Sequence, residues 1–339
     1  MKLRLFLGLA CIVLLGVSCA TSTQDAAEPP FMLKQVAPNV WAAISNPKAK
    51  AAAWANTGFV IGDDGVAVID TTVSVDADSN LGTEPAKQLL AAIRTLTTLP
   101  VRFVINTHYH GDHVGANAVF KDAGAIVLAH HNVRGWIQSE NLRMFDKDIT
   151  PQQKAFIDAL VPPTVTFDQP VNLYLGSREI RLRSFPGHTG GDSVVLIPDA
   201  KVVFTGDLFW RNMLPNLIDA STKPWIDTLD VLAKTEADAT FVPGHGDVGN
   251  AQDLAAFRDY LVTLRTLVSD AQALRKSGEA LADAVMPALS DKYSAWDLSS
   301  TLRDQTSSRR TPSCAAKRGF HQRNRATDVI EAPVRPRRS

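Results

Sequence analysis

The stretch that indicates the fold most clearly is Val101-Arg102-Phe103-Val104-Ile105-Asn106-Thr107-His108-Tyr109-His110-Gly111-Asp112-His113. Its apolar first half is typical of a buried strand. Its second half places three imidazoles and a carboxylate within six residues, although the whole chain has only 8 histidines among 339 residues. A polar loop with incidental histidines is the alternative. Because His and Asp are ligands of zinc and similar metals, we predict a metal site at the end of this strand.

The spacing of these side chains indicates two groups of ligands. His108 and His110 are two residues apart and share a face of an extended backbone, so both can bind one ion. Asp112 and His113 follow Gly111, where the chain can turn and present ligands to a second ion.

Three further ligand candidates lie at or just after expected strand ends, and glycine directly precedes each one. They are His188, Asp207 and His245. Each is a weak signal alone, since a histidine or aspartate after glycine is common in loops. Together with the central cluster they provide seven nitrogen or oxygen ligands, which is enough for two ions.

With these residues in this order, the sequence resembles the metallo-β-lactamase superfamily from about residue 36 to about residue 275. The resemblance rests on the His-x-His-x-Asp-His motif at residues 108–113 and on the three later candidates. It implies an α/β fold, a four-layer αββα sandwich in which two central sheets are flanked by helices and the metals lie at one edge. Asp70 matches the family's first short motif and is expected to hydrogen-bond to the metal ligands without binding metal itself.

The resemblance also implies a role for each ligand. The first metal is expected to be bound by His108, His110 and His188. The second is expected to be bound by Asp112, His113 and His245, with Asp207 bridging both. Two zinc ions are the expected cofactors, and iron and manganese are the alternatives.

The bridging aspartate narrows the function that the resemblance implies. At the position of Asp207, zinc β-lactamases of one subclass have cysteine and those of another have serine. This chain has Asp207 and no cysteine between Cys19 and Cys314. It therefore resembles the glyoxalase II, lactonase, phosphodiesterase and quinoprotein-relay hydrolase branches more. Our hypothesis is an exported dinuclear-zinc hydrolase, in which a metal-bridging hydroxide oriented by Asp112 and Asp207 cleaves an ester, thioester, lactone or amide bond.

Two alternative activities also fit the sequence. One is β-lactam hydrolysis. The other is oxygenation by a mononuclear iron site, which in this fold uses one metal held through two histidines and one aspartate. The intact second set of ligands argues against the iron enzyme, and metal analysis with an oxygen-consumption assay separates it from the dinuclear zinc hydrolase.

Several residues near the motif are candidates for contacts with substrate. Tyr109 lies between ligands and is expected to be an exposed residue, with a hydrogen bond to substrate as the alternative. Trp210 and Arg211 follow Asp207 and could line the pocket, although Arg211 could equally be a surface residue. The loops at 72–84 and 208–222 are expected to shape the pocket.

The two ends differ from the body in composition. Residues 1–20 have a short basic start and an apolar core, which predicts a signal peptide and export to a bacterial periplasm. Cleavage after Ala20 is one expectation, and a lipid anchor on Cys19 is the other. A linker at 21–30 precedes a hydrolase domain at 31–300 with C-terminal helices. Residues 301–339 are basic, lack periodicity and are expected to be a disordered tail, from 304 on either native or out-of-frame sequence.

Charge and cysteine content exclude some classes of protein. The formal net charge is zero, but residues 304–339 carry nine Lys or Arg against three acidic residues, so the body is negative. Nucleic-acid binding is therefore not expected, and the expected partner is a small-molecule substrate. The lack of body cysteines excludes a disulfide framework. The sequence does not fix the oligomeric state.

Apolar periodicity predicts alternating strands and helices along the body. A hairpin is expected at 57–70, and the adjacent histidines at 130–131 are expected to begin a helix rather than bind metal. Further strands are expected at 101–106, 125–128, 171–175, 179–185, 193–197, 201–205 and 240–242. Helices are expected at 84–97, 116–122, 131–144, 151–160, 224–236, 251–276 and 278–289.

Overall fold

The computed structural model describes residues 28–76, 80–144 and 149–298. The signal peptide expected at 1–20, most of the linker at 21–30 and the tail at 301–339 lie outside these residues. Within the described ranges, no helix is both long enough and apolar enough to cross a membrane.

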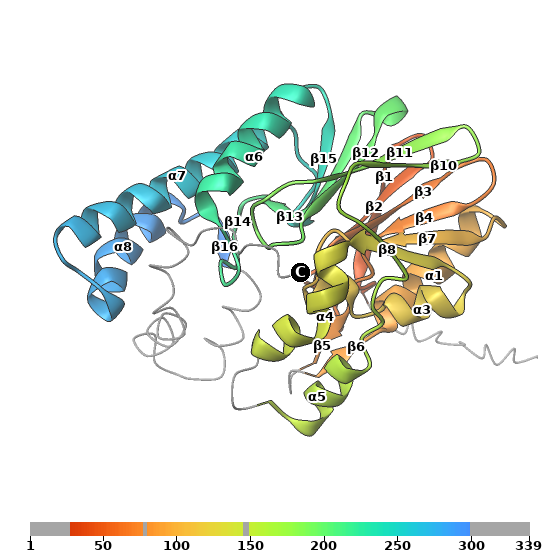
Figure 1. The fold of residues 1–339 in the computed structure, drawn as a ribbon, viewed down its shortest axis with the longest axis horizontal. Helices are drawn as coiled ribbons and strands as arrows, with labels where there is room; N and C mark the ends of the chain where they lie inside the picture. The colour runs from red at the N-terminus through yellow and green to blue at the C-terminus, as the bar shows by residue number, and fades with distance from the viewer. Residues whose placement is uncertain (1–27, 77–79, 145–148, 299–339) are drawn as a thin grey trace, which may run out of the picture.

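The first half of the chain forms a seven-stranded sheet with the order β1-β2-β3-β4-β7-β8-β9 (Figure 1). Neighbouring strands are antiparallel from β1 to β4 and parallel from β4 to β9. The predicted hairpin is confirmed, since β3 and β4 are joined through the Asp63-Asp64-Gly65 turn. The strands are β1 (Phe31–Ala37), β2 (Val40–Ser45), β3 (Thr57–Ile61), β4 (Val66–Ile69), β7 (Val101–Ile105), β8 (Ile126–His130) and β9 (Val165–Phe167).

The second half forms a five-stranded sheet with the order β10-β11-β12-β13-β15. It is antiparallel except for the final parallel pair, β13 with β15. The strands are β10 (Val171–Leu175), β11 (Arg178–Ser184), β12 (Ser193–Ile197), β13 (Val202–Trp210) and β15 (Thr240–His245). The prediction that one strand ends at residue 205 is wrong, because β13 continues through Gly206 and Asp207, with shifts in its register to β15, and all nine residues are buried.

The two sheets pack face to face and helices cover their outer faces, which confirms the αββα sandwich (Figure 1). Between the sheets, apolar side chains such as Ile69 and Ile105 meet Leu182 and Phe204. On the first sheet lie α1 (Glu84–Leu96) and α3 (Asn117–Asp122). The outer face of the second sheet is covered by α6 (Thr222–Thr235), α7 (Ala251–Ala273) and α8 (Gly278–Lys292).

Shorter elements surround the edge where both sheets end near the histidine cluster. The helix α4 (His131–Met144) begins at His131, as predicted for the adjacent histidines. A short parallel strand pair links Met213–Leu214, in the segment after Asp207, with Asp297–Leu298 at the end of the described residues. The remaining elements are α2 (Gly111–Val114), α5 (Pro151–Asp158), a short 3-10 helix (Pro198–Ala200), and the strand pairs β5 (Ser74–Val75) with β6 (Leu81–Gly82) and β14 (Met213–Leu214) with β16 (Asp297–Leu298).

Candidate metal centre

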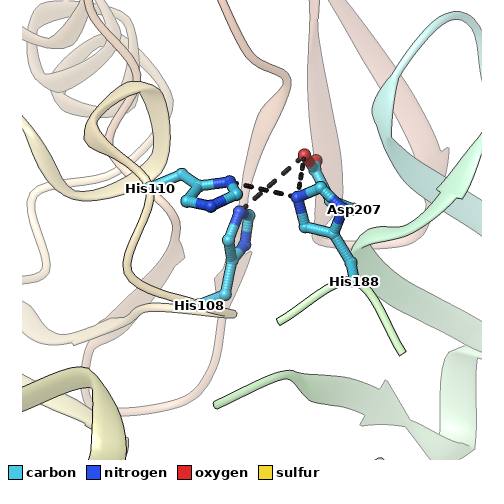
Figure 2. Close-up of side chains that lie close together, drawn as sticks. All are labelled: His108, His110, His188 and Asp207. Carbon is cyan, nitrogen blue, oxygen red and sulfur yellow. Dashed lines mark hydrogen bonds and ion pairs between the residues drawn. The ribbon is translucent and has the colours of Figure 1, made fainter. Parts of the chain in front are cut away.

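The seven side chains singled out from the sequence converge at this edge in two groups. Within each group, one ligand atom from every residue lies within 4.8 Å of the others. Figure 2 shows the first group, whose side chains point toward a common centre. The first group is His108, His110, His188 and Asp207, and the second is Asp112, His113 and His245.

Asp207 joins the two groups because its two carboxylate oxygens face different histidines. Oδ2 lies 3.1 Å from Nε2 of His188 and 3.8 Å from Nε2 of His108 (Figure 2). Oδ1 lies 3.0 Å from Nε2 of His113 and 3.4 Å from Nε2 of His245. Asp207 therefore presents one oxygen to the imidazoles of each group.

Several polar atoms at this centre are buried and make no hydrogen bond. They are Nε2 of His108, His113 and His245, and Oδ1 of Asp207. Buried polar atoms without partners are rare in folded proteins, because each costs free energy. Four of them directed at one place fit bound cations as the missing partners, and imidazole with carboxylate is a donor set that suits zinc and similar dications.

Asp70 fixes the orientation of the first ligand segment. It follows β4, is buried, and accepts hydrogen bonds from the Thr107 backbone N–H at 2.8 Å and the Thr107 hydroxyl at 2.7 Å. Its Oδ2 also lies 2.9 Å from Nδ1 of His113, and the Thr107 hydroxyl lies 3.1 Å from Nδ1 of His108. Asp70 therefore directs Nε2 of both histidines toward the centre, His113 by contact and His108 through Thr107.

Two glycines allow the backbones to approach at this point. A Cβ at Gly244 would overlap Oδ1 of Asp207, and a Cβ at Gly206 would overlap the Thr107 side chain. Gly206 also has a φ of +51°, a left-handed conformation that costs other residues free energy. These glycines let β13, β15 and the segment after β7 approach closely enough for their ligand side chains to lie in one site.

Asp112 and His113 lie on the short helix α2 rather than in an irregular turn. The His113 backbone N–H bonds to the carbonyl of His110, so helical geometry begins directly after the first pair of histidines. Oδ2 of Asp112 lies 3.3 Å from Nε2 of His245 and 3.6 Å from Nε2 of His113. The change from extended to helical backbone separates the ligands of the two groups.

Burial and charge shift the pKa values of the second group in opposite directions. Burial lowers the pKa of His113 and His245, but the nearby carboxylates of Asp207 and Asp112 outweigh it. The pKa of His113 is therefore raised, and that of His245 is raised to about 9. Burial raises the pKa of Asp207, yet the surrounding imidazoles lower it well below its ordinary value. Without metal, His113 and His245 therefore carry positive charge beside these carboxylates, whereas burial lowers the pKa of His108 and His110 in the first group.

The three residues predicted as contacts for substrate have different surroundings. Tyr109 is only 2% exposed and packs edge-on against Trp136, so the expectation of an exposed residue is wrong. Burial and nearby carboxylates raise its pKa. Trp210 is buried and stacks on His245 with ring centroids 3.9 Å apart. Nε of Arg211 lies 3.2 Å from Asp253, which balances the arginine charge within the protein.

Sequence reasoning missed a second acidic residue at the first group of ligands. Oδ2 of Asp219 lies 3.2 Å from Nε2 of His110, and Arg143 on α4 pairs with the same carboxylate. Burial would raise the pKa of Asp219, but His110 and Arg143 lower it to about 2. No motif surrounds Asp219, and the available signal was its place in the 208–222 segment expected to shape the pocket.

Comparison with known proteins identifies the family. The family model described as the metallo-beta-lactamase superfamily matches residues 55–245, more than half of the chain. A hydroxyacylglutathione hydrolase of Methylococcus capsulatus is 25% identical over 54% of this chain and 63% of its own length. A linear primary-alkylsulfatase of Pseudomonas is 21% identical over 54% of this chain and 40% of its own length. The matched region thus spans less than two thirds of either relative.

Solved structures with this fold include proteins named as metallo-β-lactamases. One from Pontibacter korlensis has a TM-score of 0.55 and 23% identity, and the match covers 68% of this chain and 99% of the other. DIM-1 metallo-β-lactamase has a TM-score of 0.52 and 18% identity over 70% of this chain and 99% of its own. These likenesses show the fold, and the family model shows that the chain belongs to the metallo-β-lactamase superfamily.

Proposed function

We propose that this protein is a hydrolase that holds two zinc ions and cleaves an ester, thioester, lactone or amide bond of a small substrate. The observation that carries the proposal is the position of Asp207, whose two oxygens face two separate sets of imidazoles. A site for one ion would not need the second group, which nevertheless gathers within 4.8 Å.

Each ligand has a stated task in this proposal. His108, His110 and His188 would hold one ion, Asp112, His113 and His245 the other, and Asp207 would contact both. Bound dications supply Lewis-acid chemistry, since they can lower the pKa of a coordinated water to about 7 and polarise a carbonyl. The chain's own contribution is orientation, because Asp70 and Thr107 hold the imidazoles and the buried carboxylates offset cationic charge.

Thioesters and esters are the substrate classes that we place first. Two kinds of observation support them: relatives at 25% and 27% identity are named hydroxyacylglutathione hydrolases, and the residue whose oxygens face both groups is an aspartate, Asp207. An acylglutathione is a thioester. The same donor set also supports attack on a sulfate ester, the bond named in the alkylsulfatase relative.

A substrate panel with a metal control tests this function. The panel contains an acylglutathione, an aryl ester, a lactone, a primary alkyl sulfate and a β-lactam, with oxygen consumption recorded in parallel. We expect turnover of the thioester or ester that chelation abolishes and zinc restores. No chelator-sensitive turnover of any bond, or oxygen uptake that requires iron, would contradict the proposal.

We also propose that the protein is exported to the periplasm of a bacterium. The support is the basic start, apolar core and small residues of positions 1–20. Fractionation of cells that express the full chain, with the intact mass of the product, tests this. A product that retains residues 1–20 in the cytoplasm would contradict it, whereas lipid mass on Cys19 would identify the anchored form.

A further inference from the structure

Asp70 and Thr107 orient His108 and His113, but they do not contact His110. Its Nδ1 lies 3.0 Å from Nε2 of His188, on the side of the first group of ligands. Its Nε2 lies on the other side of the ring, 3.2 Å from Oδ2 of Asp219. A carboxylate at Nε2 holds the ring proton there, which leaves the lone pair of Nδ1 directed at the site.

Asp219 is itself held in place by residues of α4. Its Oδ1 pairs with a terminal nitrogen of Arg143, and Nε of Arg143 donates to Oε2 of Glu140 at 2.8 Å. The Asp219 side chain is 10% exposed, so the contact is largely shielded from solvent. Two carboxylates flank this one guanidinium, which favours a bracing role for Arg143 over binding of an anionic substrate.

Asp219 is placed to act through His110 and not as a ligand itself. It contacts the imidazole nitrogen that faces away from His188, and it belongs to neither group of converging ligand atoms. His108 and His113 receive the equivalent contact from Thr107 and Asp70. The segment between β14 and α6 thus provides for His110 what the residues after β4 and β7, Asp70 and Thr107, provide for the other two histidines.

We propose that Asp219 is a positioning residue that fixes the tautomer and ring orientation of His110, and that Arg143 and Glu140 hold Asp219 in place for this task. The inference rests on the proposed function, because it requires that the first group binds an ion. It adds a second source of orientation, on a different part of the chain from Asp70.

Removal of this contact should weaken metal binding at the first group without unfolding the protein. Loss of such a partner behind a metal ligand typically reduces metal affinity about 10–100-fold. We expect that loss in Asp219→Ala. Asp219→Asn keeps an oxygen that can accept from Nε2, so we expect a smaller loss of roughly 3–10-fold. Arg143→Met should fall between wild type and Asp219→Ala.

The matched control is Asp230→Ala. Asp230 on α6 also pairs with an arginine, because Nε of Arg258 donates to it at 2.8 Å, but among the described residues no histidine bonds to it. This control separates loss of an acid–arginine pair from loss of the contact with His110. Circular dichroism and thermal melting of every metal-free variant establish that each is folded.

The experiment is a chelator competition on the full chain, first with zinc and then with cobalt. Cobalt absorption in the visible range reports ligand geometry, so it should change in Asp219→Ala and remain unchanged in Asp230→Ala. If Asp219→Ala does not fold, Asp219→Asn and Arg143→Met carry the test. Wild-type affinity and cobalt absorption in the folded Asp219 and Arg143 variants would overturn the inference, even with the metal site established.

The failure of the proposed function has a different signature. A folded wild-type protein that binds neither zinc nor cobalt would remove the metal site, and with it the basis of this inference. Tight binding by wild type together with unaltered binding by the variants overturns only the role of Asp219.

Discussion

At the scale of single residues, the site depends on how closely Gly244 lets β15 approach Asp207. A Cβ at Gly244 would overlap Oδ1 of Asp207, the oxygen that faces His113 and His245. We expect Gly244→Ala to displace this carboxylate and reduce metal content and turnover by at least about tenfold. Metal analysis by mass spectrometry and the panel assay measure the change.

Gly135→Ala is the control for that substitution. Gly135 lies within α4, and a Cβ there would meet nothing within 4 Å. Alanine in a helix interior is more favourable than glycine by roughly 0.5–1 kcal/mol, so Gly135→Ala should keep its metal and melt at the same or a higher temperature. Full metal content in Gly244→Ala would show that the close approach is unimportant.

Asp70 contacts His113 and Thr107 on the side away from the metal site, and its loss should affect both stability and metal binding. It accepts from the Thr107 N–H, the Thr107 hydroxyl and His113. Asp70→Ala leaves these buried donors without a partner, which should lower the free energy of unfolding by about 3–5 kcal/mol. Chemical denaturation of the metal-free protein measures this cost.

The Asp70 prediction has a graded comparison in Thr107→Val, which removes only the hydroxyl. We expect a smaller loss of about 1–2 kcal/mol, since one hydrogen-bonding group disappears. If Asp70→Ala unfolds at the same denaturant concentration as wild type, the carboxylate does not hold the segment in place.

At the scale of elements, α6 supports β13 through Trp225. This side chain is fully buried, its indole N–H donates to the Leu208 carbonyl at 2.9 Å, and its ring lies edge-on to His188. Trp225→Ala should lower the free energy of unfolding by about 3–5 kcal/mol because it leaves a large cavity. Trp225→Phe should lower the free energy of unfolding by less, because it keeps an aromatic ring and removes the indole N–H that bonds to Leu208.

Thermal and chemical unfolding of both Trp225 variants measure these effects. We also expect weaker metal binding in Trp225→Ala, since β13 carries Asp207 and the cavity opens beside His188. A Trp225→Ala protein with wild-type stability would contradict the packing of α6 on this strand.

The sequence predicted the elements better than the path of the ligand strands. Apolar periodicity located the strands at 171–175 and 193–197 and the helix at 131–144 with the observed bounds. It failed at Gly206-Asp207, a pair typical of a turn. There β13 continues instead, with its pairing to β15 shifted around Gly206, so tertiary contacts with Thr107 override the local signal.

The convergence of the seven ligands could be predicted because their motifs follow apolar runs in the order that the family shares, although Asp207 proved to lie within β13. Asp219 could not be predicted, since it lies in a loop whose shape depends on the Arg143 pair from a distant helix. The burial of Tyr109 was missed for the same reason: Trp136, which covers it, comes from α4.

At the scale of the whole molecule, metal binding should depend strongly on pH. Without metal, the pKa of His113 is raised and that of His245 is about 9, so both hold protons at neutral pH. Bound metal must displace these protons, and affinity should rise up to about tenfold per pH unit for each proton released. The rise should level off above the His245 pKa of about 9.

The stability of the metal-free protein should change in the opposite direction at high pH. A raised histidine pKa contributes stability that is fully present below the unfolded value, about 6.5, and is lost as the pH rises through about 9. Chelator competition and melting temperatures across this range measure both trends. Metal affinity that does not vary with pH would contradict the protonated state assigned to His113 and His245.

The central claim is that Asp207 bridges two bound ions, and the metal content of the Asp207→Ala variant tests it most directly. Wild type and variant are reconstituted with zinc, freed of excess ion and analysed by mass spectrometry, with folding confirmed by circular dichroism. We expect two ions per wild-type chain and a loss at both groups in the variant, because each of the two groups loses one carboxylate oxygen. A folded variant that retains two ions with wild-type affinity would contradict the account.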